Sequence, residues 1–369
     1  MDFELSDEQE LLRQGLRELL DRACDARRVR AAAYDSPEAS DPELWQSLAG
    51  AGWTGVTVPQ EDGGAGLRFE DLMIVLEEAG RAVLPLPLTT TLLAARAIAA
   101  SPASAFRSGL LSRIATGDAT LTLALRDPTR DERNECAAER HGSDWQLSGS
   151  HAFVPYGPLA GLVLVEAALP ERGRGLFVVP TDAPGTSWSD LQVIDRTVPQ
   201  YDLTLDGARV EAEASLFPDD ASAAIDRLLD EWRAALAAES LGAAERMLEL
   251  TVAYAKERVQ FGRPIGANQA VKWRIADMAA AVDRMRAAVY HAAVKIDACA
   301  EDCAVAVAMA KVATAAPGAF VGSQAIHVHG GIGYTWEHDL HLYFKRIKSN
   351  ELLLGDGTAH LARVANAVL

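Results

Sequence analysis

The chain carries the stretch IHVHGGIGYTWEH at residues 326–338, and the interpretation of the whole sequence starts from it. Gly330 and Gly331 are adjacent, and Gly333 follows two residues later. Because glycine has no side chain, main-chain N–H groups at such a turn can come close to a bulky, anionic ligand. The same paired glycines are also compatible with a plain helix end followed by a tight turn.

Two further motifs flank this stretch. The segment RVQFGRPI occupies residues 258–265, with Gln269 shortly after it, and GDGTAH occupies residues 355–360. Arg258 and Phe261 are three residues apart at a predicted helix end, so we expect them to share one face. An arginine on that face can clamp a phosphate with its fork of donors while the phenyl ring packs on another ring. The alternative for Arg258 is a surface ion pair with a neighbouring carboxylate.

Charge and composition exclude several function classes. The 369 residues include 35 Lys and Arg against 52 Asp and Glu, which gives a formal net charge of −17. This balance argues against nucleic-acid binding and against adhesion to an anionic membrane. The four cysteines form no CxxC pair, the N-terminal segment is acidic and amphipathic, and we expect no apolar run of the roughly 20 residues that a membrane span needs. These features predict a cytoplasmic location.

The hydrophobic pattern divides the chain into three predicted domains. Residues 1–117 have helical spacing, with a capping box at Ser6 and Gln9. Residues 118–215 alternate like strands, which predicts a small β-barrel or sandwich. Residues 216–369 return to a period of 3.6 and are rich in alanine, as in a four-helix bundle. Predicted strands lie at 121–125, 145–147, 162–165, 175–180, Val193 and 202–208, and predicted helices lie at about 70–81, 221–258, 271–300 and 303–323, with another that starts at Asp41 and Pro42.

The three motifs, in this order and at these spacings, resemble the C-terminal half of the acyl-CoA dehydrogenases. The order of α, β and α segments resembles the same family over the whole chain. The resemblance implies an α+β fold with an N-terminal α-helical domain, a middle β-barrel or sandwich domain and a C-terminal four-helix bundle. It also implies an FAD-dependent enzyme that desaturates an acyl-CoA thioester between its α and β carbons. The closest resemblance is to subunits of actinobacterial, heteromeric acyl-CoA dehydrogenases of steroid side-chain breakdown.

The resemblance assigns residues to the cofactor as well. In the family, the positions that match Arg258, Phe261, Gln269 and Gly331 contact the FAD that a neighbouring subunit holds. This implies a homo- or heterodimer or a tetramer. It further implies an electron-transfer flavoprotein as the electron acceptor. His327 stands where family members usually have Gln. The cofactor-binding residues implied in this way are Arg258, Phe261, Gln269, His327, Gly330, Gly331, Thr358 and His360.

A carboxylate base that removes the α-proton from an apolar slot is also implied. Many members have a Glu directly before Gly-Thr, and Asp356 stands there, shorter by one methylene. A second branch places its base directly before an Arg on an earlier helix. Here that Arg is Arg233, which we also expect to bind substrate, and Trp232 precedes it, so this route requires Glu231 or Glu239. A Glu in an alanine-rich helix is more typical of a buried ion pair, and Asp356 can also be a turn residue.

The chain departs from the family in the part that cradles the flavin ring. Self-sufficient members end the first β-domain strand in a Thr-Glu-Pro-Gly-type loop, where this chain has Arg126 and no glycine. They carry a Trp-x-Thr where this chain has Phe153-Val154-Pro155. Two hypotheses therefore stay open: a dehydrogenase, alone or as an oligomer with itself, and a non-catalytic subunit that completes the FAD site of a partner. A third is another flavin enzyme on the same fold, such as an oxidase or a nitroalkane oxidase.

The histidines of the last motif also raise the question of a metal site. His327 and His329 would project to one face only on a strand. His338 and His341 follow, and Asp339 is the nearby carboxylate. Packing and flavin contact explain these residues more simply, so we expect no metal.

Overall fold

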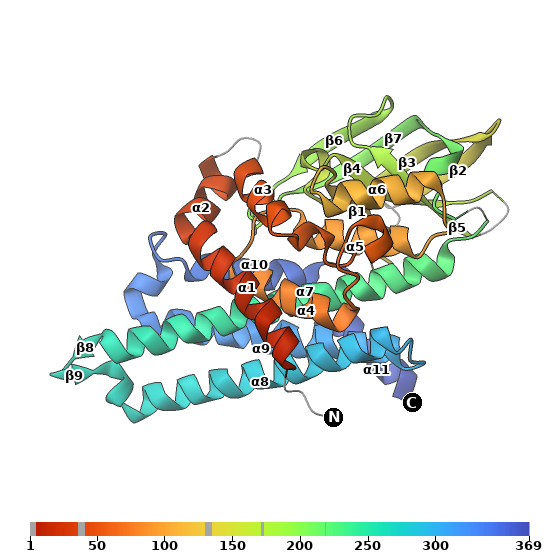
Figure 1. Ribbon diagram of the computed structural model, residues 1–369. Coiled ribbons are helices and arrows are strands. Elements are labelled where there is room, and N and C mark those ends of the chain that lie inside the picture. Colours follow the sequence, from red (N-terminus) through yellow and green to blue (C-terminus); the bar gives the residue numbers. More distant parts are fainter. Residues whose placement is uncertain (1–4, 36–40, 130–134, 171–172, 218, 369) are drawn as a thin grey trace. The chain divides into compact units, whose positions relative to one another are not determined.

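The computed structural model describes residues 5–35, 41–129, 135–170, 173–217 and 219–368, and Figure 1 shows its elements. The chain forms two compact units. The first combines residues 1–29, 69–84 and 233–369, and the second combines residues 30–68 and 85–232. The domain boundaries expected from the sequence, at residues 117 and 215, stay a prediction.

The first unit is helical. Its elements are α1 (Asp7–Ala23), α4 (Phe69–Arg81), most of α7 (Ser222–Glu257), β8 (Val259–Gln260), β9 (Arg263–Pro264), a 3₁₀ turn at Ile265–Ala267, α8 (Gln269–Asp297), α9 (Cys303–His329), a 3₁₀ turn at Gly330–Tyr334, α10 (Leu340–Leu352) and α11 (Gly357–Val368). Helices α8 and α9 pack along each other, and α9 also packs against α10 and α11. The capping box at the start of α1 is confirmed, because the Ser6 hydroxyl accepts from the Gln9 N–H and the Gln9 side chain accepts from the Ser6 N–H.

Two glycines bring α4 and α7 into direct backbone contact. A Cβ added at Gly242 would lie 1.8 Å from the carbonyl oxygen of Glu77. One added at Gly80 would lie 2.1 Å from the carbonyl oxygen of Glu239. Both oxygens belong to helical backbone and cannot move aside, so the crossing of these helices requires glycine on each side.

The crossing also buries a carboxyl group. Glu77 is 2% exposed, accepts a hydrogen bond from the Tyr290 hydroxyl at 2.7 Å, and pairs with Arg286 at 3.2 Å. Burial raises the pKa of Glu77 to about 7, and the nearby Arg286 opposes that rise. This cluster connects α4 to α8 through side chains rather than through apolar packing alone.

The second unit carries the β-sheet. Its helices are α3 (Pro42–Gly50), α5 (Leu88–Ala99), α6 (Ala105–Ala115) and the first turns of α7, with 3₁₀ turns at Trp53–Gly55, Gln60–Asp62, Gly157–Leu159 and Ala212–Ala214; α2 (Ala26–Arg30) and a π-helical turn at Ala31–Asp35 lead into it. Its strands are β1 (Leu121–Ala124), β2 (Cys136–His141), β3 (Asp144–Pro155), β4 (Leu162–Ala168), β5 (Arg174–Pro180), β6 (Thr186–Leu191) and β7 (Gln200–Val210). Asp41 caps α3 through the Leu44 N–H with Pro42 in the first turn, as expected from the sequence.

The described strands of the second unit form one seven-stranded sheet in the order β1-β4-β2-β3-β7-β6, with β5 paired to β4. Strands β1 and β4 run parallel, with Leu121 opposite Leu162, whereas β3 and β7 run antiparallel. The β3–β7 ladder shifts register after Leu147 and again after His151. Such irregularities bend long strands and increase their twist, so the sheet curls around its apolar side chains.

The fold class expected from the sequence is confirmed, namely helices, then a curled mixed sheet, then a helical C-terminal part. The strands expected at 121–125, 162–165 and 175–180 are present as β1, β4 and β5. The expectation of a strand at Val193 is wrong, because β6 ends at Leu191, and strands β2 and β6 were not expected. Both are only six residues long and contain several polar, exposed residues, which hide their alternation.

Helix α9 corrects two expectations. It runs through Pro317, Gly318 and Gly322 to His329 rather than to residue 323, and it ends where Gly330 takes a positive φ of +66°. The segment Cys303–Tyr334 is long and apolar enough to cross a membrane by length and composition, contrary to the sequence analysis. Half of its most apolar window is buried inside the protein, and a core helix passes the same test. Packing within the unit therefore accounts for the apolar composition of α9.

The helix crossing yields a test of stability. We expect Gly242→Ala to lower the free energy of unfolding by about 1–3 kcal/mol or more, because the added methyl group overlaps the carbonyl of Glu77. Gly109→Ala in α6 is the matched control, since nothing lies within 4 Å of its Cβ position and alanine favours helix there. Urea unfolding of both variants measures the difference. Equal stability of the two would contradict the direct backbone contact.

Candidate functional site

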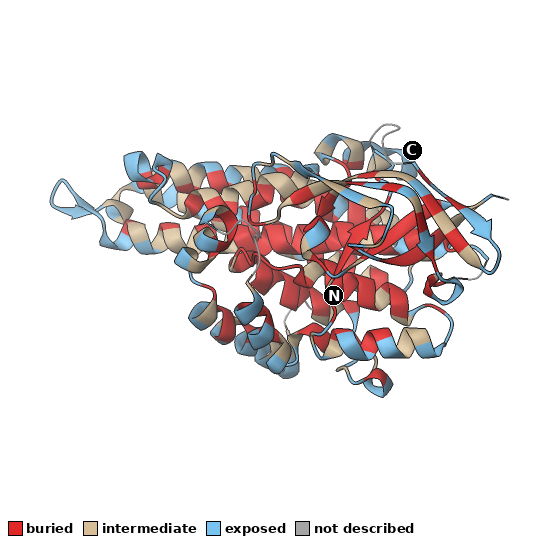
Figure 2. Ribbon diagram, turned by 90° about the horizontal axis from the view of Figure 1, so that it is seen from above, coloured by how far each residue is buried: buried red, intermediate tan, exposed pale blue. Residues whose placement is uncertain are grey.

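A β-hairpin joins α7 to α8 and carries Phe261 at its turn. The hairpin is formed by β8 and β9 and lies at the end of the α7–α8 pair (Figure 1). Phe261 is 97% exposed, and Arg258, which directly follows α7, is exposed as well. Figure 2 shows the whole hairpin as exposed. The expectation that Arg258 and Phe261 share a helical face is wrong, because the helix ends at Glu257 and the phenylalanine belongs to a turn.

The turn is strained. Phe261 has a φ of +52° and Gly262 a φ of +76°, the signs that type I′ hairpin turns require at both central residues. A left-handed conformation costs a residue with a Cβ roughly 1–2 kcal/mol. Phe261 therefore combines a strained backbone with a side chain that is exposed to water. An exposed ring contributes little packing to the stability of the isolated chain. Such an outlier points to a contact outside the chain.

The glycine turn after α9 starts beside the base of this hairpin. The ring of His329 stacks on that of Tyr254, with centroids 4.3 Å apart, and His338 packs edge-on against His329 at 4.6 Å. Tyr254 stands four residues before Arg258 and accepts its N–H through its carbonyl at 2.8 Å. His329 is followed directly by Gly330. The segment that starts at Arg258 and the glycine turn that starts at Gly330 are about 70 residues apart in sequence. They therefore begin next to each other at one end of the helical unit.

The glycine turn itself is open. Gly330 has φ +66° and ψ −141°, a conformation that is essentially restricted to glycine. No atom lies within 4 Å of a Cβ built at Gly330 or Gly331, so their backbone is accessible to a ligand. His327 and Gln269 are exposed, the latter as the first residue of α8. We call the exposed residues at this end of the unit the clamp: Arg258, Phe261, Gln269, His327, Gly330 and Gly331.

Asp356 lies at the start of α11. One carboxylate oxygen accepts the N–H of Ala359 at 2.8 Å, and its carbonyl accepts the N–H of His360 at 3.1 Å. The carboxylate therefore caps the helix, which is the turn role that the sequence also allowed. Asp356 is exposed in this chain, as is Thr358 two residues later. The other carboxylate oxygen is available for chemistry.

Buried donors hold the main chain before Asp356. The sequence pointed to two of them, Arg233 and His360, but not to Lys311. The ammonium of Lys311, on α9, donates to the carbonyls of Asn350 and Leu353, the latter at 2.9 Å. The carbonyl of Leu354 accepts from Nε of Arg233 at 3.4 Å and lies 3.0 Å from Nε2 of His360. Lys311 carries no motif, and its position in an apolar stretch of α9 was the available signal.

Arg233 and His360 thus lie in the interior. Arg233 is 4% exposed and His360 2% exposed. Burial, reinforced by the positive charges of Lys311 and Arg233, lowers the pKa of His360 to about 4, so its ring is neutral at pH 7. Nε2 then donates to Leu354, and Nδ1 has no hydrogen-bond partner among the described residues. The cofactor role of His360 and the substrate role of Arg233 stay predictions.

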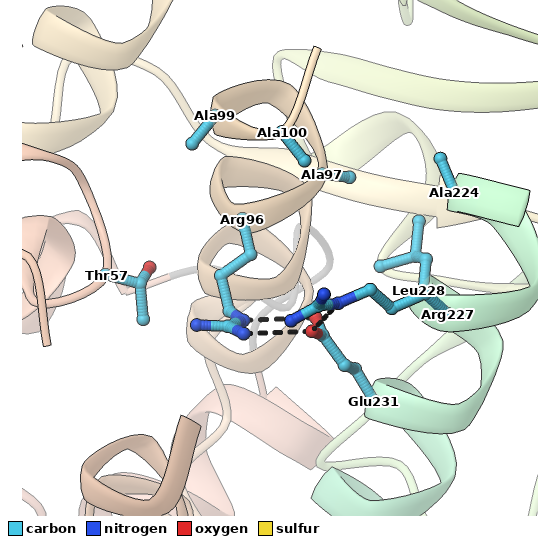
Figure 3. A pocket seen from close by; sticks show the side chains of 9 residues that line it. All are labelled: Thr57, Arg96, Ala97, Ala99, Ala100, Ala224, Arg227, Leu228 and Glu231. Carbon is cyan, nitrogen blue, oxygen red and sulfur yellow. Dashed lines mark hydrogen bonds and ion pairs between the residues drawn. The ribbon is translucent and has the colours of Figure 1, made fainter. Parts of the chain in front are cut away.

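The two alternative carboxylates are both engaged. Glu239 pairs with the buried Arg346 at 3.2 Å and accepts from Nδ2 of Asn350 at 3.3 Å. The buried ion pair that the sequence favoured for Glu239 is therefore present. Glu231 receives a bidentate contact from Arg96, at 2.9 and 3.1 Å, and a further bond from Arg227 at 3.0 Å (Figure 3). Glu231 and Glu239 are thus both held in ion pairs with arginines, whereas, among the described residues, the Asp356 carboxylate accepts a hydrogen bond only from a main-chain N–H of its own helix.

The Glu231 ion group borders a small cavity of about 140 Å³ within the second unit. Figure 3 draws the side chains that line it. Thr57, Leu228 and alanines from α5, the residue after it and α7 supply the rest of its wall. Both oxygens of Glu231 are already bonded, so the cavity offers no uncommitted acid or base.

In the loop after β1, where the family cradles the flavin ring, Arg126 and Asp127 make hydrogen bonds within the chain. The N–H of Arg126 donates to Glu166 at 2.8 Å, and Asp127 accepts from both the N–H and the hydroxyl of Thr129. Burial raises the pKa of Glu166, and Arg174 opposes this with an ion pair at 3.3 Å. His151 lies beneath, fully buried, and its pKa is lowered to about 4 by burial.

No group of three metal-binding side chains gathers within the part of the chain that the structure describes. His327 and His329 both lie on α9, where His327 points to solvent and His329 is buried.

Comparison with known proteins settles the family. The model of the acyl-CoA dehydrogenase N-terminal domain matches residues 6–118, and that of the C-terminal domain matches residues 222–369. The chain is 34% identical to the acyl-CoA dehydrogenase IpdE2 of Mycolicibacterium smegmatis over 98% of both chains. The chain belongs to the acyl-CoA dehydrogenase family. Among solved structures, the Tcur3481–Tcur3483 steroid ACAD is 37% identical over 98% of each chain with a TM-score of 0.88, and the ChsE4–ChsE5 complex from Mycobacterium tuberculosis is 29% identical over 100% of this chain and 99% of that chain with a TM-score of 0.91.

The predicted resemblance is thereby confirmed, including relatives of the actinobacterial type. Acyl-CoA dehydrogenases are oxidoreductases that act on the CH–CH bond of an acyl-CoA and use FAD, so the predicted enzyme class and cofactor are confirmed at the level of the family. The clamp fits this cofactor, because it offers a guanidinium, an exposed aromatic ring and an open glycine backbone to an ADP moiety.

The buried neutral histidine predicts a pH dependence. The pKa of His360 is about 4 in the fold and about 6.5 in an unfolded chain. The unfolded chain therefore binds more protons in this window, and the stability contributed by His360 is present above about pH 6.5 and lost as the pH falls toward about 4. We expect His360→Gln, which keeps a donor near Leu354, to lose less stability between pH 7 and pH 5 than the wild type does. Urea melts measure this; the exposed His141→Gln is the control, and parallel profiles for all three proteins would contradict the assignment.

Proposed function

We propose that this chain is a subunit of an FAD-dependent acyl-CoA dehydrogenase that introduces a double bond between the α and β carbons of an acyl-CoA. One observation carries the proposal: the clamp is exposed, strained at Phe261 and open at its glycines, as a surface that grips a neighbour's cofactor must be. The functional unit is accordingly a homo- or heterodimer or tetramer. The steroid-related relatives favour a bulky acyl group.

In the proposed reaction Asp356 takes the α-proton of the thioester, breaking one C–H bond. The electron pair of that bond becomes the new carbon–carbon double bond as the β-hydrogen leaves. Bound FAD would supply the oxidant for this step: the β-hydrogen would leave to it with an electron pair, so that the acyl-CoA is oxidised by two electrons and the cofactor is reduced by two. Asp356 stays protonated until the product departs. The carboxylate is held by the Ala359 N–H, which leaves its second oxygen for the proton.

The clamp residues divide the work of holding FAD. Arg258 supplies a forked, permanently charged donor for a phosphate. Phe261 offers a ring face for stacking, and the backbone N–H groups at Gly330 and Gly331 can reach phosphate oxygens. Gln269 and His327 add polar contacts from the first turn of α8 and the last turn of α9. We place the reduced cofactor's reoxidation with an electron-transfer flavoprotein and the protein in the cytoplasm.

A second candidate function is a non-catalytic subunit that lends its clamp to a partner. The loop after β1 favours it, because the Arg126 N–H and one carboxylate oxygen of Asp127, Oδ1, are already bonded inside the chain. Arg126 and Pro155 also replace the hydroxyl-bearing residues that the family uses there. The absorption spectrum of the chain purified without a partner separates the two candidates. Stoichiometric FAD that acyl-CoA reduces supports the enzyme, whereas a colourless chain that gains FAD only with a co-expressed partner supports the second role.

The turn of the hairpin allows stability and cofactor binding to be separated. We expect Phe261→Asn to raise the stability of the flavin-free chain by up to about 1 kcal/mol, because Asn-Gly is the preferred type I′ turn. The same variant should bind FAD more weakly, since the aromatic contact is lost. Thermal unfolding and flavin absorbance per subunit measure the two effects in one preparation. A variant that is less stable but retains FAD would mean that Phe261 serves its own fold.

Arg258→Ala tests the phosphate contact. We expect FAD affinity to fall by about 10- to 100-fold, the value of a charge-assisted bidentate contact, with no change in the melting temperature of the flavin-free chain. Arg263→Ala is the matched control, because Arg263 stands on the same hairpin and bonds Asn268 instead. Titration with FAD in the assembled oligomer gives both affinities. Equal losses of FAD affinity in the two variants would mean that Arg258 contributes only its positive charge and no specific phosphate contact.

Asp356→Asn tests the base. Asparagine keeps the helix cap but cannot take the proton, so we expect the rate of flavin reduction by acyl-CoA to fall by about 10² to 10⁴ with little loss of stability. Asp356→Glu restores the family's usual residue and should keep activity. Stopped-flow absorbance at the flavin band is the measurement. An unchanged rate for Asp356→Asn in the assembled complex would favour the non-catalytic role.

A further inference from the structure

Lys311 is a buried cation that donates hydrogen bonds to main-chain oxygens. It is 2% exposed on α9, and its ammonium donates to the carbonyls of Asn350 and Leu353 and reaches that of Glu351 at 3.4 Å. These carbonyls belong to the last turn of α10 and the residue after it, where intrahelical partners run out. The positive charge also faces the negative end of the helix dipole. Lys311 thus caps α10 from another helix.

The turn that Lys311 holds leads directly to Asp356. Leu354 has a φ of +59° and Gly355 a φ of +103°, so a residue with a side chain is kept in the left-handed region. The Leu354 carbonyl is fixed from the other side by Arg233 and His360. Strain of this kind persists only where its surroundings over-determine it. Three donors from α7, α9 and α11 therefore set the path of the chain two residues before the carboxylate.

The desolvation of Lys311 argues for a role beyond stability. Burying an ammonium costs several kcal/mol, and an apolar side chain of similar volume in this alanine-rich bundle would avoid that cost. What an apolar residue cannot do is hold three carbonyl oxygens in one geometry. Side-chain reach matters here because Asp356 is one methylene shorter than Glu, and an error of about 1 Å in placing a reacting group can cost on the order of 10²-fold in rate.

We propose that Lys311, assisted by His360, is a positioning residue for the catalytic carboxylate, acting through the main chain of residues 350–354. It touches neither substrate nor cofactor. The inference rests on the proposed function of Asp356 as base. It adds that the aspartate works because the turn behind it is held rigidly by a lysine that contacts backbone oxygens.

The test is a double-mutant cycle in the FAD-loaded oligomer, with the partner subunit co-expressed where assembly requires it. We expect Lys311→Met to slow flavin reduction at saturating acyl-CoA by about 10- to 100-fold, with FAD content and half-saturating acyl-CoA within about threefold of wild type. In the Asp356→Asn background the same change should cost less than about threefold, because the group that it positions is already absent. Lys348→Met, on α10 and paired to the Glu351 side chain, is the control and should keep the wild-type rate.

Each outcome decides the inference. If the losses in the rate of flavin reduction add fully in the double variant, or if only the FAD content falls, Lys311 serves general stability and the inference is overturned. A wild-type rate in Lys311→Met would overturn it as well while leaving Asp356 in place as base. If Asp356→Asn alone has no effect, the proposed function fails first and the inference falls with it. Should Lys311→Met not fold, Lys311→Arg, which keeps the charge but not the three-carbonyl geometry, enters the same cycle.

Discussion

Positive charge buried inside an alanine-rich bundle needs oxygen partners, and this requirement organises the first unit. Arg346 finds them at Glu239 and at the carbonyl of Leu84, and Lys311 finds them at the end of α10. Small alanine and glycine side chains let the helices approach closely, as at Gly242, but offer no directional contact of their own. The buried polar bonds therefore set which way α10 and the following turn run, and Asp356 lies at the end of that turn.

The clamp, in contrast to these buried charges, is a feature of the surface. Its residues are exposed, its turn is strained at Phe261, and its glycines leave the backbone open. For an isolated chain each of these features is unfavourable, so their coincidence at one end of the bundle is best explained by a surface that another protomer completes. The stacking of Tyr254 on His329 makes the coincidence possible, because it joins the ends of α7 and α9. Solved structures similar to this chain include the ChsE4–ChsE5 complex.

Much of the fold was readable from the chain because local signals agreed. The capping box at Ser6, the Asp-Pro start at residue 41 and the long alanine-rich helices all appear where the pattern predicts them. The failures have physical causes. Strands β2 and β6 are short and partly exposed, so their alternation is weak. Helix α9 continues through Gly318 and Gly322 and ends only before Gly330. The shared helical face expected for Arg258 and Phe261 failed because a two-residue turn reverses the chain between them.

The sequence by itself determined the family and the cofactor class, because spaced motifs of glycine, arginine and phenylalanine are visible without coordinates. It also singled out the residues of the clamp, whose contacts with the cofactor stay a prediction. Tertiary structure alone decided which carboxylates are uncommitted and what holds the turn before Asp356. Glu231, Glu239 and Lys311 look alike in a helical pattern, since each is a charged residue among alanines. Their roles differ because their partners come from other helices or loops, as far as 135 residues away, and such contacts exist only when the chain is folded.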